Sequence, residues 1–166
     1  MKRRALVVSA AAAVAVAFVV GVVWWIRAGS GSGSGERLTD AGREISKDGV
    51  SVVVPAAWPK NRLECGTPVA DTYVLDPGNV PTCALSPEPK VSFVALRESD
   101  LSADPANAAA ATPAEIGGVS VRTGADTLPD GRARWLAVVP DRDIVVEVVS
   151  ADPGLVASIS GSVRID

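Results

Sequence analysis

Histidine is absent from this chain of 166 residues, and that absence excludes several classes of site. Without an imidazole there is no Ser-His-Asp triad, no Cys-His pair and no histidine metal ligand. Two cysteines are too few for a four-cysteine zinc site or an iron–sulfur cluster. Aromatic residues make up only 4% and the formal net charge is −3, which argues against base-stacking platforms and basic nucleic-acid footprints. We therefore predict no cofactor, no metal and no nucleic-acid partner.

Recognisable catalytic motifs are also missing. Nucleophilic catalysis without histidine needs a serine–lysine or carboxylate arrangement. Beyond residue 27 the only lysines are Lys47, Lys60 and Lys90, and none belongs to a Ser-x-x-Lys motif. The sequence has no phosphate-binding loop and no Asn-x-Ser/Thr acceptor for glycosylation. We predict that the protein is not an enzyme.

One short segment near the C-terminal end is rich in acidic residues. Asp141 and Asp143 flank Arg142, and Glu147 follows four residues later. Paired carboxylates serve glycoside hydrolysis or bind Ca²⁺. The segment lies between two predicted strands, however, so we interpret these acids as a solvated turn.

The longest apolar run comprises residues 5–26, which are 22 residues without a charge. At ~1.5 Å per residue, a helix of this length spans about 33 Å, enough to cross a bilayer core of roughly 30 Å. Three cations precede the run within residues 1–4, and Arg27 alone follows it directly. The positive-inside rule places residues 1–4 in the cytoplasm and the remainder outside. We predict a single-pass protein of the cell membrane with a signal-anchor helix at 5–26.

A cleaved signal peptide is the alternative for this run. Signal peptides have a shorter apolar region, with small residues at the cleavage site behind it. Here the bulky residues Trp24, Trp25 and Ile26 occupy that place, although Ala28 follows soon after. The sequence therefore favours an uncleaved anchor.

Small residues recur every fourth position along the predicted anchor, at Ser9, Ala13, Ala17 and Gly21. Such a stripe allows a second helix to approach closely. It predicts a packing face and a homo-oligomer formed through the membrane helix, unless the alanine-rich composition produced the pattern by chance.

Residues 27–44 read as a Gly/Ser-rich linker, and residues 45–166 as the extracytoplasmic domain. Alternating Gly and Ser between Gly29 and Gly35 form a flexible coil that packs no core. All 19 acidic residues lie beyond the predicted anchor, so the domain is acidic. Its two cysteines, Cys65 and Cys83, predict one disulfide, because an exported chain is oxidised and the pair lacks the spacing of a redox motif.

The domain is predicted to be α+β, with a mainly antiparallel sheet and one or two short helices. Asp104 and Asp152 each precede a proline, which is the pattern of a capped helix start. The run at 144–149 is almost continuously β-branched, which suits a central strand covered on both faces. Trp58 is expected to pack over a sheet edge rather than stand in a binding surface. The expected strands are 50–54, 72–75, 91–97, 119–123, 132–139, 144–149 and 162–165; the expected helices begin near 105 and 153.

The two ends of the domain, residues 49–58 (GVSVVVPAAW) and 155–164 (LVASISGSVR), resemble those of small exported Mog1/PsbP-type domains. The resemblance covers about 20 residues and implies an antiparallel sheet paired with helices and an accessory or binding role. It carries over no functional residue. The Cys65–Cys83 loop and the short middle helix depart from that pattern.

These observations predict a domain that acts as a non-catalytic module for an extracytoplasmic protein partner. A carrier of a small ligand or lipid is the alternative, and would be marked by an internal apolar cavity. A histidine-independent hydrolase ranks third, and would show a buried carboxylate or lysine with a shifted pKa in a cleft.

Overall fold

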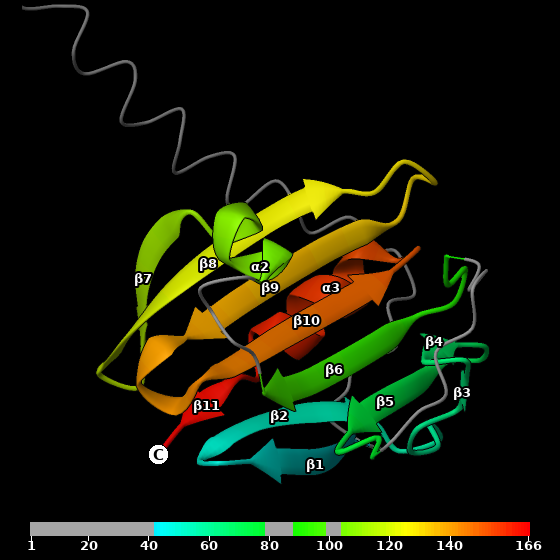
Figure 1. The fold of residues 1–166 in the computed structure, drawn as a ribbon, viewed down its shortest axis with the longest axis horizontal. Coiled ribbons are helices and arrows are strands. Elements are labelled where there is room, and N and C mark those ends of the chain that lie inside the picture. Colours follow the sequence, from blue (N-terminus) through cyan, green and yellow to red (C-terminus); the bar gives the residue numbers. More distant parts are fainter. Residues whose placement is uncertain (1–41, 79–87, 99–103) are drawn as a thin grey trace, which may run out of the picture. The chain divides into compact units, whose positions relative to one another are not determined.

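The computed structural model describes residues 42–78, 88–98 and 104–166. The chain divides into two units, residues 1–34 and residues 35–166, and every described residue belongs to the second. The described part of this unit is mainly β-sheet with few helices (Figure 1). This content fits the predicted α+β class.

The largest sheet has six strands, in the spatial order β5 (Thr72–Leu75), β6 (Phe93–Glu98), β10 (Ile144–Ser150), β9 (Ala133–Val139), β8 (Val119–Thr127) and β7 (Thr112–Ile116). All neighbouring pairs are antiparallel except β5 and β6, which run parallel. The antiparallel meander of β8, β9 and β10 follows the sequence prediction. The parallel pair of β5 and β6 was not predicted, and a mainly antiparallel sheet allows it.

Two smaller sheets complete the described strands. The first has β2 (Val50–Pro55) between β1 (Gly42–Lys47) and β11 (Arg164–Ile165), both antiparallel to it. The second is a short hairpin of β3 (Leu63–Glu64) and β4 (Thr67–Pro68). Because β11 pairs with β2, the C-terminal end of the chain closes against the first strands of the domain.

Strand β10 lies at the centre of the large sheet, with both faces covered as predicted. Ile144, Val146 and Val148 point into the main core, whereas Val145 and Val149 face the opposite side. All five are fully buried. Alternation of side chains along a strand explains how one valine-rich run fills the main core on one face and two smaller clusters on the other.

The two helices pack on opposite faces of the large sheet, in front and behind in Figure 1. Helix α2 (Pro105–Ala109) lies against β8 and β9, and helix α3 (Pro153–Ser160) lies against β9, β10 and β2. Asp104 and Asp152 are the N-caps, and each carboxylate accepts a hydrogen bond of 2.8 Å from the backbone N–H two residues ahead. The capped starts predicted from the two Asp-Pro pairs are confirmed.

The main core lies between the large sheet, α3 and β2. Val50, Val52 and Val54 of β2 are fully buried in it, beside Ile159 of α3. Trp58 is only 7% exposed and belongs to the same core, so its predicted packing role is confirmed.

Two elements differ from the sequence expectations. Strand β1 begins at Gly42, inside the segment that the sequence predicted as linker. The sequence did not indicate this edge strand, because only Ile45 in it is buried and its apolar pattern is weak. Strand β7 forms where no element was expected. Gly117 and Gly118 have φ of 61° and 83°, the left-handed conformation that a tight two-residue hairpin turn between β7 and β8 requires.

No helix among the described residues is long and apolar enough to cross a membrane. The predicted anchor at 5–26, with its packing face of Ser9, Ala13, Ala17 and Gly21, lies outside the described residues, and so does Cys83. The anchor, the packing face and the disulfide therefore stay predictions.

Candidate functional site

The candidate site lies on the face of the large sheet that carries α2, here called the outer face. Ala106 of α2 and its C-cap Ala110 pack on Leu136, Val138 and Val145 and cover one end of it. Beyond this covered end the outer face becomes polar and then apolar again. Its side chains come from three neighbouring strands: Phe93, Ala95 and Arg97 of β6, Glu147 and Val149 of β10, and Arg134 of β9.

Helix α2 approaches the sheet closely because of a glycine in β8. A Cβ atom on Gly124 would collide with the carbonyl oxygen of Ala109 and lie 3.1 Å from the Cα atom of Ala110. A side-chain hydrogen bond from Arg122 of β8 to Asn107 adds a polar tie. The position of α2 therefore depends on the missing side chain at Gly124.

Glu147 occupies the middle of the outer face. Its register partners are Ala95 on β6 and Leu136 on β9, so small or apolar residues flank it on both sides. Its side chain is 21% exposed. No group in the described part of the chain donates a hydrogen bond to its carboxylate, and the only nearby ion-pair atom is Nη1 of Arg134, at 3.9 Å.

Two arginines lie diagonally from Glu147 on the neighbouring strands, Arg97 on β6 and Arg134 on β9, and each is bound to an aspartate. Arg134 donates from Nε and Nη2 to the two carboxylate oxygens of Asp126, at 2.8 and 2.5 Å. Arg97 forms the same two-bond arrangement with Asp104, the N-cap of α2. These bonds direct one edge of each guanidinium group at its aspartate, and Nη1 of Arg134 remains at ion-pair distance from Glu147 without a hydrogen bond to it.

Burial raises the pKa of Glu147, since the environment favours the neutral form of a desolvated carboxyl. The charges of Arg97 and Arg134 oppose this shift, but they do not cancel it. The pKa of Asp126 shifts in the opposite direction, because the hydrogen bond from Arg134 holds it below its usual range. The fold therefore makes Glu147 costly to ionise.

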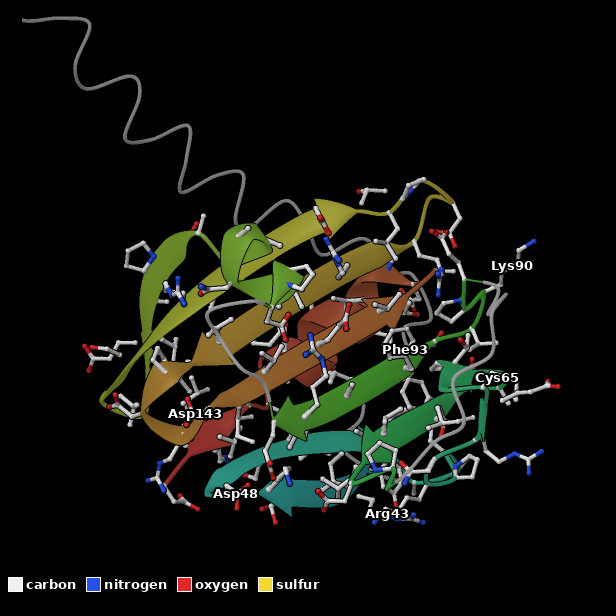
Figure 2. The ribbon with its side chains drawn as sticks, viewed as in Figure 1. Arg43, Asp48, Cys65, Lys90, Phe93 and Asp143 are labelled. Carbon is white, nitrogen blue, oxygen red and sulfur yellow. The ribbon has the colours of Figure 1, made fainter. Side chains whose placement is uncertain are left out.

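A hollow of about 190 Å³ opens beside Glu147. Apolar side chains dominate its wall, with Phe93 visible at the start of β6 in Figure 2. Three charged residues, Glu88, Arg132 and Glu147, also contribute to the wall. The lining residues are Glu88, Pro89, Phe93, Leu128, Pro129, Arg132, Glu147 and Val149.

Arg132 fixes the turn that closes one side of the hollow. Its side chain is buried and donates from Nε to Asp130 at 2.7 Å and from Nη1 to the carbonyl oxygen of Val91 at 2.7 Å. These bonds join the β8–β9 turn to the segment before β6. They hold the turn in place at one side of the hollow.

A second cluster of charges lies at the sheet edges and is internally satisfied. The Lys47 ammonium contacts Asp76 at 2.5 Å and Glu98 at 2.8 Å, and these two bonds raise its pKa above the usual range. They tie β1 to the ends of β5 and β6. Because its charges are mutually paired, this cluster is a structural tie.

The exposed edge of the large sheet offers little for strand addition. Edge strand β7 carries Pro113, which lacks a backbone N–H, and the exposed charge of Glu115. Both features are devices by which edge strands avoid pairing with another chain. Recognition by added strands is therefore disfavoured at this edge.

The residues that the sequence singled out lie in different places. Asp141 and Asp143 are exposed in the turn between β9 and β10, labelled at Asp143 in Figure 2, as a solvated turn predicts. Glu147 was grouped with them, and that grouping is wrong, because it lies within β10 on the outer face. Cys65 lies in the turn between β3 and β4 (Figure 2).

Sequence reasoning missed Glu147 as a site residue, although a signal was present. A single carboxylate interrupts the run Ile-Val-Val-Glu-Val-Val of a strand predicted to be covered on both faces. A charge at a covered position needs a partner or a function.

Neither a protein-family model, nor a curated protein, nor a solved structure matches this chain. The Mog1/PsbP resemblance therefore stays a prediction. Within residues 42–78, 88–98 and 104–166, no group of three or more acidic or cysteine side chains is placed to hold a metal ion.

Proposed function

We propose that this chain is a membrane-anchored protein whose extracytoplasmic domain is a non-catalytic module that binds another protein. One observation carries the proposal: the outer face holds a mostly buried carboxylate, Glu147, that receives no hydrogen bond within the described chain and adjoins an open hollow. Its oxygens stay in reach of water, so a ligand that covers them has to supply a donor, because a buried polar group without a partner is costly. The bonds of Arg132 and the contacts of α2 hold the two sides of this face in position.

A carrier of small ligands or lipids fits the hollow less well. Ligand pockets measure roughly 300–1,000 Å³ and enclose most of the ligand. The hollow on the outer face measures about 190 Å³. That volume suits one side chain presented by a partner better than a whole lipid.

A hydrolase is also supported less than a binding module. Glu147 meets one criterion for it, a carboxylate with a raised pKa at a hollow. Carboxylate catalysis needs a second, ionised group beside the first. Asp104 and Asp126, whose charges act on Glu147, are instead bound by Arg97 and Arg134.

The membrane attachment in this proposal rests on the sequence. Residues 5–26 supply the anchor, the cation bias places the domain outside, and the Gly/Ser linker lets the domain reorient near the membrane. The stripe of Ser9, Ala13, Ala17 and Gly21 supports association of two copies through the anchor.

Site-directed photo-crosslinking in intact cells tests the proposal. A photoreactive residue replaces Pro129, which is exposed at the rim of the hollow, in the tagged full-length chain. The matched control replaces Ser158, which is exposed on α3 behind the sheet. We expect one protein to be captured reproducibly from position 129 and not from 158. No capture, or the same products from both positions, would contradict the proposal.

A further inference from the structure

The hollow combines an apolar wall with a negative end. Phe93, Leu128 and Val149 supply apolar surface, and the rings of Pro89 and Pro129 extend it toward the rim. Glu147 contributes a carboxylate at the wall. A guest that fits both features has a hydrocarbon stem and a polar head.

The charges around the hollow favour a cationic head. Arg132 is the cation in its lining, and its donors are directed at Asp130 and at the carbonyl oxygen of Val91. Glu88 is exposed at the rim and adds a second negative charge beside Glu147. An anionic guest would meet these two carboxylates, whereas Arg132 is paired with Asp130.

The nearest arginines are poor partners for Glu147. Nη1 of Arg134 lies 3.9 Å away, beyond hydrogen-bond distance, while Nε and Nη2 bond to Asp126, and Arg97 is bound to Asp104. No described residue donates a hydrogen bond to the Glu147 carboxylate. Its acceptor atoms are therefore available to a donor from outside.

We propose that the hollow receives a lysine side chain of the protein partner, with the methylenes against Phe93, Leu128 and Val149 and the ammonium on Glu147. Lysine fits because its four-carbon stem is apolar and its compact ammonium group is a point charge with three donors. A single carboxylate without other ligands suits such a point charge. This assignment rests on the proposed function, since the lysine belongs to the partner.

A titration of the full-length chain in detergent micelles, followed by methyl NMR, tests the assignment. Pentylammonium is the probe, and 1-pentanol, which has the same stem without the charge, is its matched control. We expect saturable shifts of the Leu128 and Val149 methyl signals with pentylammonium, and binding about tenfold weaker for 1-pentanol. Equal affinities for the two probes, or no saturable shift at these methyl groups, would overturn the assignment.

Two variants complete the test. Glu147→Gln keeps the size of the side chain and removes its charge, and we expect it to lose the preference for pentylammonium. Glu115→Gln removes an exposed charge from β7 and is expected to bind like the natural chain. An unchanged preference in Glu147→Gln would assign the cation to another group and overturn the proposal.

The two proposals fail separately. The titration contains no partner protein, so a negative titration together with position-dependent crosslinking would remove the lysine assignment and leave the binding function. A positive titration without any crosslink at position 129 would leave a cation site and remove the binding function.

Discussion

Nη1 of Arg134 lies 3.9 Å from the carboxylate of Glu147, while Nε and Nη2 of the same guanidinium group bond to Asp126. Glu147 therefore has a neighbouring charge but no hydrogen bond from the described residues. A ligand that excluded water from this carboxylate would have to supply a donor, because a buried charge without a partner is costly. The hollow beside Glu147 leaves room for such a ligand.

The first prediction concerns the stability of Glu147→Gln. The folded state raises the pKa of Glu147 above its ordinary value of 4.5, so ionisation of this group opposes folding. Its stabilising contribution is complete below about pH 4.5 and is lost as the pH rises through the folded pKa. We therefore expect Glu147→Gln to be more stable than the natural chain by about 0.5–1 kcal/mol at pH 7, with the difference vanishing near pH 4.

Thermal unfolding of both chains between pH 4 and pH 8 measures this difference. Asp76, Asp126 and Asp130 have lowered pKa values, so both chains lose stability as the pH falls further, and the comparison cancels that loss. A Glu147→Gln chain that is less stable at pH 7 would mean that the arginines compensate Glu147 after all.

The second prediction concerns Gly124→Ala. The new Cβ would collide with the carbonyl oxygen of Ala109, so α2 has to lift from the sheet. Overpacking of this kind costs about 1–3 kcal/mol. Hydrogen exchange of the Ala110 N–H, which bonds to the carbonyl oxygen of Ala106 at 2.8 Å, should accelerate.

A neighbouring substitution provides the control for Gly124→Ala. Ala125→Ser changes an exposed position of the same strand and should alter stability by less than about 0.5 kcal/mol. Equal stability and equal exchange in both variants would show that α2 does not depend on Gly124.

The third prediction concerns the disulfide between Cys65 and Cys83. Thiol labelling of the denatured, unreduced protein should find no free cysteine. Closing a loop of roughly 19 residues stabilises a domain by about 3 kcal/mol in the chain-entropy account, so reduction should lower Tm. Detection of two free thiols would remove this link.

The fourth prediction concerns topology. Alkaline phosphatase fused after Gly35 should be active and a cytoplasmic reporter at the same position silent, because the cation bias places this residue outside. The opposite pattern would refute the orientation.

The intact mass of the membrane form tests whether the anchor is cleaved. It should match the full chain apart from Met1; a loss of about 28 residues would indicate a cleaved signal peptide.

The parts of the fold that sequence could predict have strong local signals. The valine run of β10 indicated a strand covered on both faces, and the Asp-Pro pairs at 104 and 152 marked both helix starts. Strand β1 lacked such a signal, because one buried residue, Ile45, specifies it and its pairing with β2 supplies the rest. The parallel pairing of β5 and β6 depends on long-range contacts that local patterns do not contain.

The candidate site was less accessible from sequence. Sequence spacing grouped Glu147 with Asp143, whereas its environment comes from Arg97 and Arg134 on two other strands. The role of Gly124 depends on a helix that lies fifteen residues earlier at Ala109. Both relationships appear only when the sheet register brings distant residues onto one face.

In this proposal, a protein binds at the hollow and donates to Glu147, whose carboxylate receives no hydrogen bond from the described residues. The measurement that tests it most directly is the yield of the partner crosslink from position 129 in chains that carry Glu147→Gln or Glu115→Gln. We predict that Glu147→Gln lowers the yield by at least about tenfold and that Glu115→Gln leaves it unchanged, since loss of one member of a buried charge contact usually weakens binding strongly. An equal yield in all three chains would contradict the account.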